Sequence, residues 1–182
     1  LSQGFKNAGV EILAGFDDDL EALDTFQHNF GTSDAIAADL SNPNPALFSR
    51  YQKVDVLLGG PPCQGFSIAG KRNINDPRNS LTKSYLDIVK ILSPKIVVIE
   101  NVPNILSMGG GSYSQAIIHG LGQLGYSVQV HKLNAADFGV PQNRKRVFFI
   151  ASRDIKDLTE DLRSRHIDVP VTTANAISDL PL

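Results

Sequence analysis

The first half of the chain alternates short apolar runs with apolar positions at helical spacing. An apolar run at 10–16 is followed by three aspartates and by apolar residues at 20, 23, 26 and 30, which predicts a strand, an acidic turn and a helix. A short apolar piece follows at 35–38. The continuous run 54–58, closed by Gly-Gly-Pro-Pro, predicts a strand buried on both faces, and residues 81–92 predict a helix that Pro94 stops.

The second half continues this alternation. Apolar runs predict strands at 96–99, 126–133 and 147–151, and residues 114–124 predict a helix. The pattern therefore indicates an α/β protein with a doubly wound, mostly parallel sheet covered on both faces. In such sheets ligands bind outside the carboxyl ends of the strands. Chemically useful side chains follow four predicted strands, and we expect them to share one edge of the sheet: Asp17, Asp39, Cys63 and Glu100.

The composition of the chain excludes several classes of function. The 182 residues carry 17 Lys and Arg against 19 Asp and Glu, a net charge of -2, so any nucleic-acid binding must be local. A single cysteine excludes a disulfide framework and a multi-thiolate zinc site, and the four histidines lack metal-ligand spacing, so we expect no metal. No run of 18 apolar residues occurs, and no secretory signal pattern opens the sequence, so we expect no membrane association.

A dinucleotide-like GxGxxG pattern at 120–125 has the wrong context. A phosphate-binding pattern of this kind follows a strand and opens a helix, whereas this one closes a predicted helix. We therefore expect its glycines to serve close packing and the helix C-terminus.

The segment GGPPCQGFS at 59–67 is the most specific local feature of the sequence. A lone cysteine usually packs in a core, but Cys63 follows two prolines at the end of a strand, which favours a presented thiol. Glu100 follows the next predicted strand, and Arg144 and Arg146 lie in a third segment. A thiolate, a carboxylic acid and guanidinium groups together suit covalent catalysis on an electron-poor ring.

Three motifs, in this order, resemble the catalytic motifs of the DNA cytosine-5 methyltransferases. They are Pro62-Cys63-Gln64, Glu100-Asn101-Val102 and the segment QNRKR at 142–146. The resemblance runs from Leu1 to about Ala151. It implies a Rossmann-like, S-adenosylmethionine-dependent methyltransferase fold, with transfer of a methyl group to C5 of cytosine in DNA.

The resemblance also implies the catalytic roles. Cys63 would add to C6 of the base, and Glu100 would act at N3 as a carboxyl group whose pKa is raised by burial. Arg146 would hold the base oxygen, and Arg144 would help position Cys63 and the ring.

The implied cofactor is S-adenosylmethionine. The carboxylate of Asp17 suits its ribose diol, the carboxylate of Asp39 suits its adenine amino group, and Leu40 would give a backbone and an apolar contact. Helix capping is the alternative role for Asp17, since three consecutive aspartates precede a predicted helix.

The implied partner is double-stranded DNA, bound by a monomer. A stacked base cannot present C6 to a thiol, so the cytosine must be flipped out of the duplex. The expected DNA-binding residues are Gln64, Ser67, Lys71 and Arg72, although a solvated surface loop is the alternative reading of 67–80. In a prokaryote such an enzyme would be cytoplasmic and nucleoid-associated, as part of restriction-modification or as an orphan methylase.

The sequence also suggests boundaries. We expect a catalytic and cofactor-binding core at 1–155 and, at 156–182, a linker towards a target recognition domain. LSQGFKNAG at 1–9 resembles the tail of the family's cofactor loop, so the fold is expected to be truncated at both ends and these residues alone to methylate little. Two alternatives stay open: a tRNA cytosine-5 methyltransferase of the same fold, and a catalytically inactive remnant or scaffold.

Overall fold

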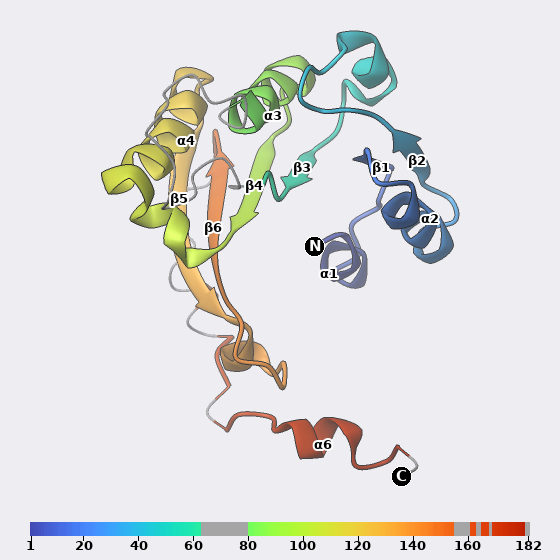
Figure 1. The fold of residues 1–182 in the computed structure, drawn as a ribbon, viewed down its shortest axis with the longest axis vertical. Helices are drawn as coiled ribbons and strands as arrows, with labels where there is room; N and C mark the ends of the chain where they lie inside the picture. The colour runs from blue at the N-terminus through green and yellow to red at the C-terminus, as the bar shows by residue number, and fades with distance from the viewer. Residues whose placement is uncertain (63–79, 155–160, 163–164, 168, 181–182) are drawn as a thin grey trace. The chain divides into compact units, whose positions relative to one another are not determined.

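The computed structural model describes residues 1–62, 80–154, 161–162, 165–167 and 169–180 (Figure 1). They form two compact units, Leu1–Pro94 and Lys95–Leu182. Among the described residues, no helix is long and apolar enough to cross a membrane. The predicted boundary between a core at 1–155 and a linker at 156–182 stays a prediction.

The first unit contains a parallel strand pair and the helices around it. Its elements are α1 (Ser2–Asn7), β1 (Ala14–Asp17), α2 (Leu20–Asn29), β2 (Asp34–Ala37), the 3-10 helix η1 (Pro45–Tyr51), β3 (Val56–Gly59) and α3 (Ser80–Leu92). β1 and β2 pair in parallel, and α2 is the crossover between them. α2 begins after Asp19, whose carboxylate accepts hydrogen bonds from two backbone N–H groups of the first turn.

Aromatic and aliphatic side chains from η1 and α3 form the core of this unit. The buried members are Phe48, Tyr51, Ile88 and Leu92. Phe16 of β1 packs on this cluster, with its ring centroid 5.1 Å from that of Phe48. This contact fixes the strand that ends in Asp17.

The burial of β3 differs from what the sequence predicts. The run 54–58 predicts a strand buried on both faces, but all four residues of β3 are only half-buried. By contrast, Val97, Val98 and Ile99 of β4 (Ile96–Asn101) are buried. The physical reason is that β3 lines a pocket of the first unit.

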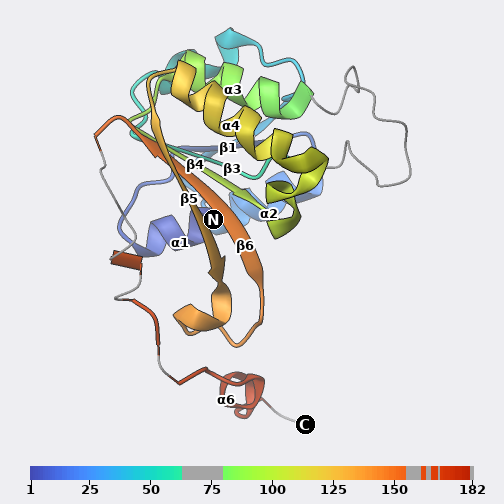
Figure 2. The same cartoon turned by 90° about the vertical axis from the view of Figure 1, so that its left-hand side faces the viewer.

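The second unit is built on three antiparallel-paired strands. Its remaining elements are the 3-10 helices η3 (Pro103–Leu106), η4 (Met108–Gly111) and η5 (Ala135–Phe138), the helices α4 (Ser112–Gln123) and α6 (Thr173–Ile177), and the strands β5 (Ser127–Asn134) and β6 (Lys145–Ser152). β6 lies between β4 and β5 and is antiparallel to both. α4 packs along these strands and buries Ile117 and Leu121 (Figure 2).

The strand pairing is therefore mixed rather than mostly parallel. β4 and β5 run in the same direction because α4 is a crossover between them, as the alternation predicts. β6 follows β5 through a short connection without a crossover helix, so it must run antiparallel. The glycine pattern at 120–125 closes α4 as expected, with Gly125 just past the helix at a φ of 85°.

Candidate active site

Two carboxylate side chains of the first unit lie at the ends of neighbouring strands. Asp17 is the last residue of β1, and Asp39 lies two residues after β2. The backbone N–H of Ala38 donates to the carbonyl of Asp17 at 2.9 Å, which holds the two strand ends side by side. Both side chains are exposed and line the same pocket. The parallel register thus brings together the two residues that the sequence proposes for the cofactor.

Local hydrogen bonds orient both carboxylates. Asp17 Oδ1 accepts from the backbone N–H of Asp19 at 3.1 Å, while Asp19 itself caps α2. Asp39 Oδ1 accepts from the backbone N–H of Ser41 at 2.8 Å. Hydrogen bonds from the Ser41 side chain and backbone lower the pKa of Asp39 below its ordinary value of 3.8. Asp39 is therefore a charged acceptor at neutral pH.

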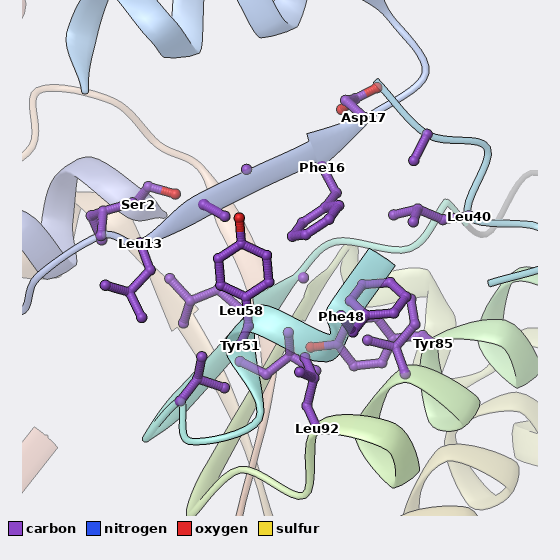
Figure 3. Close-up of a pocket in the computed structure, with 18 of the residues that line it drawn as sticks. Ser2, Leu13, Phe16, Asp17, Leu40, Phe48, Tyr51, Leu58, Tyr85 and Leu92 are labelled. Carbon is purple, nitrogen blue, oxygen red and sulfur yellow. The ribbon is translucent and has the colours of Figure 1, made fainter. Parts of the chain in front are cut away.

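The pocket itself has a volume of about 710 Å³, in the range of small-molecule sites. Figure 3 shows Asp17 and Leu40 at one end, and Ser2 and Leu13 at the other. Pro62, just before Cys63, also lines it. The pocket therefore has a polar end, at the carboxyl ends of β1 and β2, and an apolar wall along the strands.

Aromatic residues of the pocket wall were not singled out from the sequence. Phe48 and Tyr51 of η1 and Tyr85 of α3 line the pocket. Each is mostly buried and occupies a position typical of an ordinary core residue. Periodicity marks such positions as apolar faces but does not distinguish a pocket wall from a core.

In the second unit, Glu100 and Arg146 form an ion pair. Arg146 Nε lies 2.7 Å from Glu100 Oε1, and the side chains of Arg146 and Glu100 are 23% and 25% exposed. Glu100 is opposite Phe148 in the β4–β6 register, and Arg146 is two residues before Phe148. The pair is therefore a diagonal contact on one face of two antiparallel strands, within reach of long side chains.

The pairing leaves donors of Arg146 available. An arginine has five N–H donors. Nε is directed at Glu100, and Nη1 donates to the backbone carbonyl of Lys145 at 2.8 Å. Within the part of the chain that the structure describes, these two contacts leave further N–H groups of the guanidinium for a ligand. Next to Glu100, the buried Asn101 accepts a hydrogen bond from the backbone N–H of Val102, which holds the end of β4.

The remaining predicted site residues divide into two groups. Arg144 is exposed, and its carbonyl accepts from the backbone N–H of Ala135 at 3.0 Å, which closes the connection between β5 and β6. The others lie outside the described residues: Cys63, Gln64, Ser67, Lys71 and Arg72. The expectation that the strand-end residues of both units share one edge stays a prediction. Within the described ranges, no cluster of potential metal ligands occurs.

Comparison with known proteins identifies relatives over the whole length of the chain. The family described as C-5 cytosine-specific DNA methylase matches residues 1–181. The type II methyltransferase M.DdeI of Desulfomicrobium norvegicum is 42% identical over 190 residues, covering 100% of this chain and 46% of that protein. M1.HphI of Haemophilus parahaemolyticus is 40% identical over 165 residues, covering 87% and 44%. The chain spans about half the length of these curated relatives.

Solved structures agree with the sequence relatives. A crystal structure described as a "putative DNA modification methyltransferase" encoded within an E. coli prophage has a TM-score of 0.81 at 29% identity, over 99% of this chain and 51% of that one. The S. pombe Dnmt2 methyltransferase, at 20% identity and a TM-score of 0.73 over 95% and 54%, supports the fold alone. The predicted α/β methyltransferase fold is confirmed. With its sequence motifs, family match and fold in agreement, the chain belongs to the C-5 cytosine-specific DNA methylase family.

Proposed function

We propose that the protein, in its complete form, transfers a methyl group from S-adenosylmethionine to C5 of a flipped-out cytosine in double-stranded DNA. The family uses this methyl donor, and its substrate is DNA. The observation that carries the proposal for this chain is the Glu100–Arg146 ion pair, because it places a carboxyl group beside a guanidinium that keeps further N–H donors among the described residues.

Cys63 is the nucleophile of this proposal. Its thiolate adds to C6 of the cytosine, so that a sulfur–carbon bond forms, the C5–C6 double bond opens and negative charge moves towards N3. Glu100 acts at N3, and Arg146 uses its remaining N–H groups on the base oxygen. After C5 has taken the methyl group, a water molecule accepts the C5 proton, the C5–C6 double bond re-forms and the bond between C6 and sulfur breaks, which releases the Cys63 thiolate. Arg144, exposed just before β6, assists in positioning the base.

The polar end of the pocket fits the cofactor. Asp39 is held ionised by Ser41 and offers an acceptor for an adenine amino group, while Asp17 offers a carboxylate for a ribose diol. Leu40, packed on the core cluster, supplies an apolar surface. When bound, S-adenosylmethionine supplies an electrophilic methyl group.

DNA contact is proposed for Gln64, Ser67, Lys71 and Arg72, which lie outside the described residues. A role in type II restriction-modification agrees with the names of the relatives. We further propose that the enzyme acts as a monomer and, as the relatives include bacterial proteins, that it works on DNA in a bacterial cytoplasm.

The test is transfer of a tritiated methyl group by the complete protein, with mixed-sequence DNA and tRNA offered separately. Label in the DNA, absent with Cys63→Ser, is the expected result. Label in tRNA instead would assign the chain to an RNA-modifying enzyme. No label in either substrate, with the wild-type protein folded, would indicate an inactive remnant.

A further inference from the structure

Two residues after β6 contact the 3-10 helix η5, which lies between β5 and β6 (Figure 1). The backbone N–H of Ile167 donates to the carbonyl of Asp137 in η5 at 2.9 Å. The ring of His166 meets the ring of Phe138 edge to face, with centroids 5.0 Å apart and planes at 87°. This is an arrangement that aromatic rings prefer. A backbone hydrogen bond and a ring contact thus join this segment to η5.

A third contact covers the end of η5. Gly139 follows the helix at a φ of 85°, in the left-handed region that favours glycine. A Cβ built on Gly139 would lie 3.8 Å from Cδ1 of Ile167, so the Ile167 side chain packs over this residue. β6 is eight residues long and extends roughly 26 Å away from this turn. The contact is therefore tertiary and is not imposed by the continuity of the chain.

The turn at 139–144 depends on η5 for its backbone position. The N–H of Val140 donates to the carbonyl of Ala135, the first residue of η5, at 3.2 Å. The N–H of Gln142 donates to the carbonyl of Val140 at 2.7 Å, and the N–H of Arg144 donates to the carbonyl of Gln142 at 2.9 Å. These hydrogen bonds run in series from η5 to Arg144. A displacement of η5 would therefore move the backbone of Arg144.

The side chain of Arg144 relies on this backbone for its position. Arg144 is exposed, and its side chain makes no hydrogen bond, ion pair or ring contact with any residue that the structure describes. Arg146, by contrast, is held by Glu100 across the sheet. Within the described part of the chain, the turn is thus what places Arg144, and residues 166 and 167 contact the helix on which that turn is built.

We propose that His166 and Ile167 are positioning residues for methyl transfer and act through the turn that carries Arg144. The inference rests on the proposed function, in which Arg144 assists in positioning the cytosine. Without the ring contact, η5 keeps its own hydrogen bonds but moves more freely, and Arg144 is correctly placed for a smaller fraction of the time. Small misplacements of a positioning group lower a reaction rate strongly.

Amide hydrogen exchange of the complete protein tests the contact without reference to activity. In His166→Ala, the amides of Gly139 and Val140 should exchange at least about fivefold faster than in the wild type, because local opening becomes easier, while amides of β4 stay unchanged. His166→Phe keeps an aromatic ring and should exchange like the wild type. Arg165→Ala is the matched control, because the exposed Arg165 side chain contacts no described residue. Unchanged exchange at Gly139 in His166→Ala would overturn the proposal.

Single-turnover methyl transfer tests the role of the contact in the reaction. His166→Ala should lower the rate by roughly 10- to 100-fold with little change in the dissociation constants of S-adenosylmethionine and DNA, whereas His166→Phe and Arg165→Ala should keep the wild-type rate. In an Arg144→Ala background, His166→Ala should cause little further loss, because both changes act through one group. An unchanged rate in His166→Ala, or a full further loss in the Arg144→Ala background, would overturn the positioning role.

The two experiments separate this inference from the proposed function. If the wild-type protein transfers no methyl group, the proposed function fails and the positioning role fails with it. Faster exchange at Gly139 in His166→Ala would still show that the contact holds the turn. If methyl transfer occurs but neither exchange nor rate responds to His166→Ala, the proposed function stands and this inference is wrong.

Discussion

The close approach of α3 to the end of β3 gives a prediction that can be worked from distances. A Cβ added at Gly59 would lie 2.1 Å from Cε2 and 2.8 Å from Cζ of Tyr85. Carbon atoms in contact normally stay about 3.5 Å or more apart, so the ring or the strand must move by roughly 1.4 Å. Tyr85 is 9% exposed and its ring is rigid, so neither movement is free of cost.

Gly59→Ala is therefore expected to destabilise the protein by about 3 kcal/mol, the upper end of the usual cost of overpacking. For a chain of this size that corresponds to a melting temperature lower by roughly 6 to 12 °C. Urea and thermal unfolding followed by circular dichroism measure the change. Because β3 leads directly into Pro61 and Pro62, the same variant should also displace these two prolines, which line the pocket.

Gly122→Ala is the matched control. No atom of the described residues lies within 4 Å of the added Cβ, and Gly122 is exposed within α4, so alanine should stabilise the helix by about 0.5 to 1 kcal/mol. Combining Gly59→Ala with Tyr85→Leu should cost at least about 1 kcal/mol less than the sum of the two single changes. If Gly59→Ala unfolds at the same urea concentration as the wild type, the packing argument is wrong.

Three further predictions concern single groups. Glu100→Gln should lower the single-turnover rate by roughly 10² to 10⁴ with little change in DNA affinity; a loss confined to binding would give Glu100 a structural role. Asp39→Asn should weaken S-adenosylmethionine binding by about 10- to 100-fold in calorimetric titration, because a charge-assisted hydrogen bond is lost, whereas Asp19→Asn, which keeps the cap of α2, should bind normally. Since the pKa of Asp39 is lowered, affinity should stay constant from about pH 8 to about pH 5 and fall only as more acid protonates the carboxylate. Tyr85→Phe should stabilise the 182-residue chain by about 1 kcal/mol in urea unfolding, because it removes a buried hydroxyl without a partner in the described structure; a loss of stability would show that the hydroxyl is satisfied.

Local patterns predicted the order of elements well because each depends on nearby residues. The strand before Asp17, the helix after it and the helix stopped by Pro94 follow from periodicity and capping. The first strand begins at Ala14 rather than at residue 10, because its extent is set by pairing with β2. Of the adjacent aspartates, Asp19 became the helix cap, and Asp17 is therefore available to the pocket.

Features that depend on pairing between residues far apart in the sequence were not predictable. The sequence placed Glu100 and Arg146 in one site, but their direct ion pair depends on the antiparallel register of β4 and β6. The mixed strand pairing depends on whether a connection contains a helix long enough to cross the sheet. The half-buried state of β3 reflects the surface that faces it, which its own apolar run does not specify.

Trapping of the covalent adduct tests the central claim most directly. The complete protein is incubated with S-adenosylmethionine and duplex DNA carrying 5-fluorocytosine at its target positions, and the mixture is separated under denaturing conditions. Fluorine at C5 cannot leave as a proton does, so the bond between sulfur and C6 persists. The account predicts a protein–DNA adduct with the wild type and none with Cys63→Ser, whose hydroxyl is a far weaker nucleophile at neutral pH. An adduct that persists in Cys63→Ser would contradict the account.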